Sequence, residues 1–152
     1  DWSSDVCSSD LFSGYLNLPE VTAASMRGDW FVTGDLARRD EEGYLYLVDR
    51  KKDMIITGGE NVYPREIEEI LLAHPAVAEC GVAGLPHPHW GEQVTAWVVV
   101  NPSLQVDAQA LTDLCRQKLS PYKVPKAIRF IEALPRNSMG KVLRRSLRSG
   151  PL

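Results

Sequence analysis

The sequence is poor in cysteine, lacks long apolar runs and carries no large excess of charge of either sign. Its three cysteines (Cys7, Cys80 and Cys115) are odd in number and show no metal-binding spacing, so we expect reduced thiols in a cytoplasmic protein. No apolar run approaches the ~20 residues that cross a bilayer, and no basic–apolar–small pattern predicts a signal peptide. A net charge of −3 argues against a general nucleic-acid surface.

The composition is that of a folded domain. With 44% hydrophobic and 24% charged residues, the chain can bury a globular core, and 152 residues suffice for a small domain with part of a neighbour. Residues 1–12 differ from the rest, because Ser and Asp recur there without a helical or strand period. We interpret this stretch as a non-native segment, with a native acidic loop as the alternative, and exclude it from the fold prediction.

Residues 13–51 predict a short helix followed by a β-hairpin. Pro19 stands at a suitable first helical position within residues 17–26. Residues 30–32 and 44–48 have strand composition, and the turn signal Asp-Glu-Glu-Gly at 40–43 lies between them. We therefore expect these two strands to pair.

The residues after 53 predict a small α+β domain in which helices pack on a three-stranded sheet. The expected order is β-α-β-β-α-β-α, with strands near 54–57, 77–82, 94–100 and 127–131 and helices beginning near Pro64, Asp107 and Lys141. Gly58 and Gly59 would end the first strand. Cys80 falls on a predicted strand and Cys115 on the inward face of a helix, so both are expected in the core.

Four motifs follow one another along the chain. They are residues 33–35 (Thr-Gly-Asp), 49–53 (Asp-Arg-Lys-Lys-Asp), 58–64 (Gly-Gly-Glu-Asn-Val-Tyr-Pro) and 135–141 (Pro-Arg-Asn-Ser-Met-Gly-Lys). Together they resemble the late motifs of the adenylate-forming superfamily, which includes acyl-CoA synthetases, luciferases and peptide-synthetase adenylation domains. The residues of the last two motifs look most like those of fatty-acyl and malonyl-CoA synthetases. The resemblance implies that residues 13–51 end a large N-terminal adenylation domain and that 52–152 form its C-terminal lid.

Three of the motifs carry candidate nucleotide-site residues. An aspartate at the end of a strand can accept hydrogen bonds from vicinal ribose hydroxyls, although Gly-Asp is also a common turn. The resemblance favours the ribose role for Asp35, implies a nucleotide contact for Arg50 and makes Lys52 the hinge of the lid. It makes Lys141 the catalytic lysine that reaches the substrate carboxylate and the α-phosphate, whereas a solvated loop lysine is the alternative.

Arg144 and Arg145 follow Lys141 in a predicted basic helix. The composition of this helix gives no reason for either side chain to be buried. Both are therefore expected to be surface charges of the last helix.

The resemblance also implies a path for CoA. Its candidate residues are Gly58, Gly59, Trp90, Tyr122, Lys123 and Lys126. Glycines let a backbone approach a ligand closely, and an exposed indole can stack on adenine. For Trp90 and Tyr122, packing within the domain is the alternative. His87 and His89 have an H-x-H spacing without further ligand residues, so no metal site is predicted.

The implied reaction converts a carboxylic acid and ATP·Mg²⁺ to an acyl-adenylate and pyrophosphate, after which CoA takes the acyl group and AMP leaves. The ATP-phosphate, Mg²⁺ and acyl sites belong to the larger domain, so we expect this chain alone to be inactive. The alternatives are an adenylation domain that loads a carrier protein, or a non-catalytic nucleotide- or CoA-binding module. Lid motifs do not line the acyl pocket and leave the carboxylic acid open.

Overall fold

The structure is a computed structural model that describes residues 12–149. The stretch interpreted as non-native lies outside the described residues except for Phe12, and so does Cys7. The described residues fall into two compact units, one that ends at Lys52 and one that begins at Asp53. No helix in this part of the chain is both long enough and apolar enough to span a membrane.

The first unit consists of one helix and two antiparallel strand pairs. They are α1 (Pro19–Ala24), β1 (Met26–Arg27) with β2 (Trp30–Phe31), and β3 (Asp35–Arg39) with β4 (Leu45–Arg50). Pro19 occupies the first turn of α1, as expected. The hairpin around residues 40–43 is confirmed. The prediction that residues 30–32 form its first strand is wrong, because Trp30 and Phe31 pair with β1, and β3 pairs with β4.

This first unit leaves much of its apolar surface open. The four successive residues Tyr44, Leu45, Tyr46 and Leu47 are 49–63% exposed, and neighbouring strand residues point to opposite faces. Among the unit's described residues, Ala37 is the buried hydrophobic one. Exposed apolar area of this kind marks an interaction surface.

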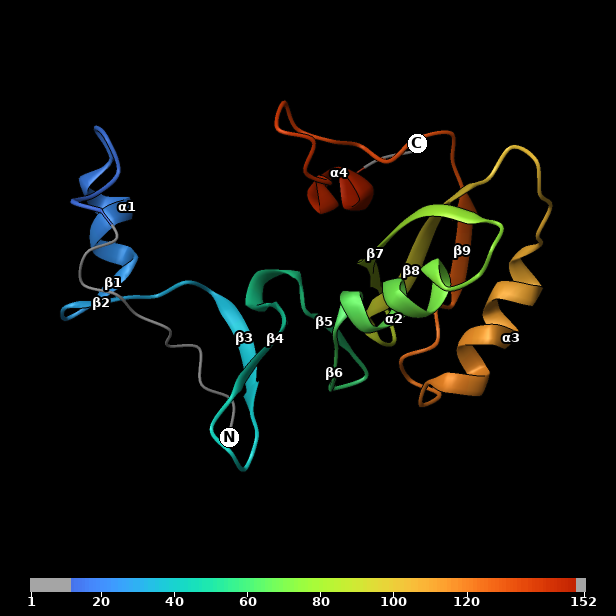
Figure 1. Ribbon diagram of the computed structural model, residues 1–152, viewed down its shortest axis with the longest axis horizontal. Helices are drawn as coiled ribbons and strands as arrows, with labels where there is room; N and C mark the ends of the chain where they lie inside the picture. Colours follow the sequence, from blue (N-terminus) through green and yellow to red (C-terminus); the bar gives the residue numbers. More distant parts are fainter. Residues whose placement is uncertain (1–11, 150–152) are drawn as a thin grey trace. The chain divides into compact units, whose positions relative to one another are not determined.

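The second unit contains a five-stranded sheet and three helices (Figure 1). Its elements are β5 (Ile55–Thr57), β6 (Glu60–Val62), α2 (Pro64–Leu72), β7 (Val77–His87), β8 (Gly91–Val100), α3 (Ala108–Lys118), β9 (Ala127–Phe130) and α4 (Arg144–Ser149). The strands run in the order β6-β5-β8-β7, and β9 pairs parallel with β8. The long hairpin of β7 and β8 is the centre of this unit.

The α+β class is confirmed, whereas the prediction of three strands is wrong. Gly58 and Gly59 end the first strand as expected, since β5 stops at Thr57. They form the two-residue turn between β5 and β6, in which Thr57 pairs with Glu60. Their φ angles of +59° and +87° suit a hairpin turn that needs left-handed backbone. The returning strand was missed because Glu-Asn-Val carries little strand propensity.

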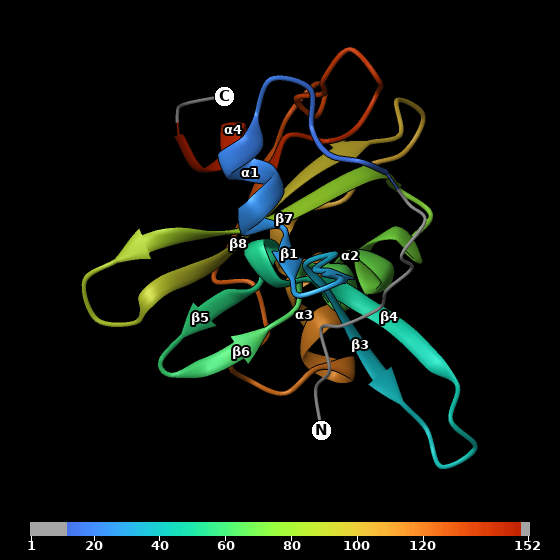
Figure 2. The same ribbon diagram turned by 90° about the vertical axis from the view of Figure 1, so that its left-hand side faces the viewer.

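Residues on β7 and β8 alternate between two cores. On one face Val82, Ala96 and Val98 belong to the cluster formed with α2 and α3. On the other face Ala83 and Trp97 pack with Leu134 and Leu147 of the C-terminal segment. Figure 2 shows β7 and β8 between α4 and the pair α2 and α3. The segment that carries Lys141 is thus anchored to the sheet at both of its ends.

A small residue permits this second packing. A Cβ atom added at Gly81 would lie 3.1 Å from Leu147 Cδ1 and 3.3 Å from Leu134 Cδ2. These separations are tighter than ordinary side-chain contacts, so the two leucines use the space that glycine leaves. The close approach holds the C-terminal segment against β7.

The two core cysteines are expected to resist alkylation. Burial raises the pKa of Cys80 to about 12, with Glu68 adding to the effect, and raises that of Cys115 to about 11. Since thiolate is the reactive form, iodoacetamide at pH 8 should spare both residues in the native chain and modify both in urea. Peptide mapping by mass spectrometry checks this, and fast labelling of either residue without denaturant would contradict it.

The same pKa shifts predict how stability depends on pH. The unfolded chain releases the thiol protons near the ordinary pKa of 9.0, whereas the folded chain keeps them. The free energy of unfolding therefore falls as pH rises through this range. Urea titrations at pH 8 and pH 10 measure the effect, and replacing both cysteines with alanine should reduce it.

Candidate functional site

Lys141 lies in a closed turn that Asn137 organises. The side-chain oxygen of Asn137 accepts hydrogen bonds from the backbone N–H groups of Met139 and Lys141 at 3.0 and 2.8 Å. The Asn137 N–H in turn donates to the Lys141 carbonyl at 2.9 Å, and Gly140 supplies a φ of +80°. The Lys141 side chain is exposed. Within residues 12–149 its ammonium has neither a hydrogen bond nor an ion pair, so its charge is free for a ligand.

Arg136 ties this turn to the sheet. Its guanidinium donates to the Gly140 carbonyl at 2.6 Å and to Glu79 on β7 at 2.7 Å. The Arg136 and Glu79 side chains are 42% and 43% exposed. Such an exposed pair contributes little to stability, but it fixes where the turn leaves the sheet.

Arg144 is not the surface charge that the sequence predicts. Its NH2 group donates to both carboxylate oxygens of Glu68 at 2.8 and 2.7 Å, and its NH1 group lies 3.3 Å from Asp53. The side chain is 22% exposed. Glu68 also accepts the backbone N–H of Val82 at 2.8 Å. Arg145, in contrast, is exposed as expected.

A pocket of about 270 Å³ brings together four of the six candidate CoA residues. Its walls comprise Thr57, Gly58, Glu60, Trp90, Pro121, Tyr122 and Lys126. They come from the β5–β6 turn, from the β7–β8 turn and from the loop before β9. Segments far apart in the sequence thus place an indole, a phenol ring and an ammonium around one recess.

Contacts on two sides hold Trp90 in this pocket. The backbone carbonyl of Trp90 accepts a hydrogen bond from the Gly58 N–H at 2.9 Å, and the backbone N–H of Trp90 donates to His87 Nδ1 at 3.2 Å. The His89 ring meets the indole edge-on, with centroids 4.4 Å apart. A Cβ atom at Gly58 would lie 3.2 Å from Trp90 Cε3. The indole therefore rests against glycine backbone while 44% of the residue remains exposed.

Lys123 and Gly59 do not line the pocket. The Lys123 ammonium donates to both carboxylate oxygens of Glu66 at 2.9 and 2.8 Å, and its side chain is only 19% exposed. This pair attaches the loop before β9 to α2. Lys123 is thus engaged inside the domain, whereas Lys126 is exposed and lies within 3.5 Å of the Pro121 carbonyl.

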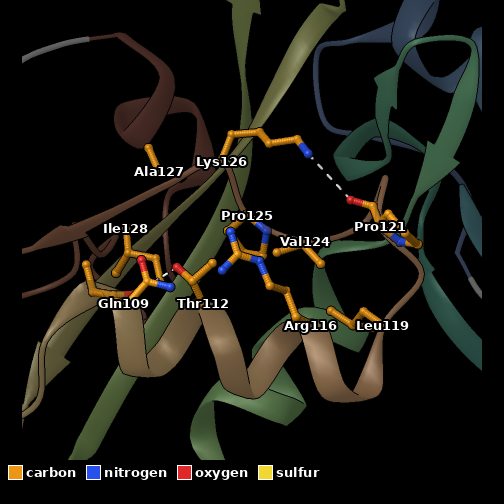
Figure 3. A pocket seen from close by; sticks show the side chains of 11 residues that line it. Gln109, Thr112, Arg116, Leu119, Pro121, Val124, Pro125, Lys126, Ala127 and Ile128 are labelled. Atoms are coloured by element: carbon orange, nitrogen blue, oxygen red, sulfur yellow. Dashed lines mark hydrogen bonds between the residues drawn. The ribbon is translucent and has the colours of Figure 1, made fainter.

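A second recess of about 540 Å³ lies between α3 and β9 (Figure 3). Lys126 crosses its upper side toward Pro121, and Arg116 reaches in from α3. Arg116 is paired with Asp113 at 2.7 Å. Nothing in the sequence predicts this recess, because its walls come from ordinary helix and loop residues without a motif.

The two candidate nucleotide residues of the first unit form an ion pair. Arg50 Nε lies 2.9 Å from Asp35 Oδ1, and the side chains are 44% and 26% exposed. Asp35 begins β3 and pairs with Arg50 across the hairpin, so its expected place at the end of a strand is wrong. Lys52, the candidate hinge, is exposed in the 3₁₀ turn Lys51–Asp53 that follows β4.

The sequence is similar to those of several CoA ligases. It is 50% identical over 137 residues to the long-chain-fatty-acid–CoA ligase of Bacillus subtilis (strain 168), covering 90% of this chain and 24% of that protein. It is 49% identical over 139 residues to the 2-succinylbenzoate–CoA ligase of Geobacillus kaustophilus (strain HTA426), covering 91% and 28%. The chain thus spans about a quarter of the length of the curated relatives that it matches.

Solved structures agree with this similarity. The o-succinylbenzoate CoA synthetase of Bacillus subtilis, solved with its acyl-adenylate intermediate, superposes with a TM-score of 0.85 at 43% identity over 91% of this chain and 28% of that one. ATP-bound MatB from Rhodopseudomonas palustris gives 0.82 at 44% identity over 90% and 27%. The profile of the family described as AMP-binding enzyme C-terminal domain matches residues 66–141, half of the chain. On these grounds the chain belongs to the AMP-binding enzyme C-terminal domain family.

Proposed function

We propose that this chain is the C-terminal part of an AMP-forming acyl-CoA synthetase. The whole protein would join a carboxylic acid to ATP as an acyl-adenylate, release pyrophosphate, and then transfer the acyl group to CoA with release of AMP. The observation that carries the proposal is the pocket in which Gly58, Trp90, Tyr122 and Lys126 meet. The CoA ligases among the relatives support the same reaction class.

Lys141 would act in the first half-reaction. When a carboxylate oxygen attacks the α-phosphorus, negative charge builds on the phosphoryl oxygens and pyrophosphate leaves. A positive charge fixed near those oxygens stabilises the transition state more than the ground state. The ammonium of Lys141 is exposed and forms no hydrogen bond or ion pair with the described residues, while its backbone is held by Asn137. These properties suit a lysine that reaches into a ligand site.

The pocket residues would act in the second half-reaction. Trp90 offers a half-exposed indole for stacking on the adenine of CoA, and Lys126 offers an ammonium for one of its phosphates. Gly58 presents backbone without a side chain, which lets the pantetheine arm pass closely. The CoA thiolate would attack the acyl carbon of the adenylate, and AMP would leave as the carbon–oxygen bond breaks.

The first unit would contribute the ribose contact. The Asp35 carboxylate can accept hydrogen bonds from the two ribose hydroxyls while Arg50 fixes its orientation. We further propose that Lys52 is the hinge that lets the second unit present Lys141 and then the Gly58–Gly59 turn. Mg²⁺ would come with ATP. Its protein ligands are proposed to lie in the larger domain, as the resemblance implies.

A CoA acceptor is favoured over a carrier protein. A carrier protein would bind through a surface, whereas the recess lined by Trp90, Tyr122 and Lys126 offers an indole, a phenol ring and an ammonium, which suit the base and phosphates of a nucleotide. A cytoplasmic location also suits the proposal, because the buried Cys80 and Cys115 carry free thiols.

The test uses the full-length protein that contains this chain. Pyrophosphate release and CoA-dependent AMP release would be measured over a panel with long-chain fatty acids, o-succinylbenzoate and malonate. We expect at least one acid to give both products and the 152-residue chain alone to give neither. Pyrophosphate release that occurs equally well without CoA, followed by acylation of a carrier protein only, would support the carrier alternative. No product with any acid would overturn the proposal.

A further inference from the structure

We propose that Arg144 is a positioning residue for Lys141, and that it acts by linking the lysine's segment to Asp53 and Glu68. This inference rests on the proposed function, since it assigns a role in adenylate formation. Arg144 stands three residues after Lys141 and begins α4. Its guanidinium binds Glu68 of α2 with two hydrogen bonds of 2.7–2.8 Å and lies 3.3 Å from Asp53.

The three charges are withdrawn from solvent. The exposed fractions are 22% for Arg144, 18% for Asp53 and 14% for Glu68. A paired charge in such surroundings holds its geometry more firmly than an exposed pair, because an unpaired partner would be left without solvation. A planar guanidinium bound by both oxygens of a carboxylate also fixes direction as well as distance.

Glu68 carries this constraint into the sheet. One of its oxygens accepts the Val82 N–H at 2.8 Å in addition to the guanidinium. Val82 is fully buried in the centre of β7. The start of α4 is therefore tied to α2 and to the edge strand of the sheet at the same point.

The turn that carries Lys141 has one tether on each side. Arg136 binds Glu79 on the side before the lysine, where both side chains are more than 40% exposed. Arg144 binds Glu68 and Asp53 on the side after it. Since the exposed ion pair is the weaker one, the Arg144 network adds the stronger ionic contact to the hydrophobic anchors Leu134 and Leu147.

Asp53 gives the network its connection to the hinge. It is the first residue of the second unit and follows Lys52 directly. The guanidinium of Arg144, three residues after Lys141, thus contacts the residue next to the proposed hinge. A movement about Lys52 would carry the Lys141 segment with it as one body.

The test separates the two half-reactions in the full-length protein. In Arg144→Ala the rate of adenylate formation should fall about 100-fold, as expected for a misplaced catalytic group, while CoA-dependent turnover of a supplied acyl-adenylate stays near the wild-type rate. Arg144→Lys keeps the charge but loses the bidentate contact with Glu68, and its adenylation rate should fall less. Glu68→Gln keeps the acceptor for Val82 and should mimic Arg144→Ala, with non-additive effects in the double variant.

Arg145→Ala is the matched control, because it removes the neighbouring exposed arginine. A second readout is tryptic cleavage after Lys141 in the 152-residue chain, which should become about tenfold faster in Arg144→Ala through local opening and stay unchanged in Arg145→Ala. Equal losses in both half-reactions would reduce Arg144 to a structural role, and adenylation at the wild-type rate in Arg144→Ala and Glu68→Gln would overturn the inference. An inactive wild type would instead refute the proposed function.

Discussion

Lys141→Ala is expected to lower the rate of adenylate formation about 10²–10³-fold, the usual effect of removing one preorganised stabiliser of transition-state charge. CoA-dependent turnover of a supplied acyl-adenylate should continue, because the pocket around Trp90 keeps all of its residues. Pyrophosphate release measures the first half-reaction, and AMP release from added acyl-adenylate measures the second.

The structure predicts that this variant folds normally. Lys141 is exposed, and its turn is closed by backbone groups and by the Asn137 side chain, none of which the substitution removes. Surface changes of this kind usually alter stability by less than about 0.5 kcal/mol. A lost activity can therefore be assigned to the missing ammonium.

Lys118→Ala is the matched control for Lys141→Ala. Lys118 is an exposed lysine near the end of α3, remote in sequence from every motif. It should keep both half-reactions at the wild-type rates. If Lys141→Ala also kept them, Lys141 would be only a solvated loop lysine, and its catalytic role would be refuted.

Much of the second unit follows from the sequence. Apolar spacing predicts α2 and α3, and the apolar run at 94–100 predicts β8, because these patterns record which faces are buried. Strand pairing that depends on the backbone is harder to predict. Gly58 and Gly59 end β5 as expected, but the sequence does not predict that their left-handed backbone forms a hairpin turn into β6.

The sequence predicts some site residues better than others, because only some of them lie in a motif. A motif marks Gly58 and Lys141, whose proposed roles require particular residue types at particular places. The sequence predicts a CoA contact for Lys123 and a surface charge for Arg144. Their partners Glu66 and Glu68 lie 57 and 76 residues away, so only the folded chain reveals that both are engaged.

Gly58→Ala is expected to raise the KM for CoA about tenfold and to leave adenylate formation unchanged. An added Cβ would lie 3.2 Å from Trp90 Cε3 and 3.5 Å from Cζ3, so the indole must shift by a few tenths of an ångström. Base stacking on an aromatic side chain contributes about 1–3 kcal/mol, and a displaced ring loses part of it. The dependence of AMP release on CoA concentration measures the effect.

Gly59→Ala separates this contact from backbone strain. Both glycines have positive φ, and an alanine there costs roughly 1–2 kcal/mol in either position. Gly59, with φ of +87°, lies further from the ordinary left-handed region than Gly58 at +59°, yet no atom lies within 4 Å of its added Cβ. If strain in the turn governed CoA binding, Gly59→Ala would be the more damaging variant. If the position of Trp90 governs it, Gly58→Ala is worse, and its effect disappears once Trp90 is itself replaced by alanine.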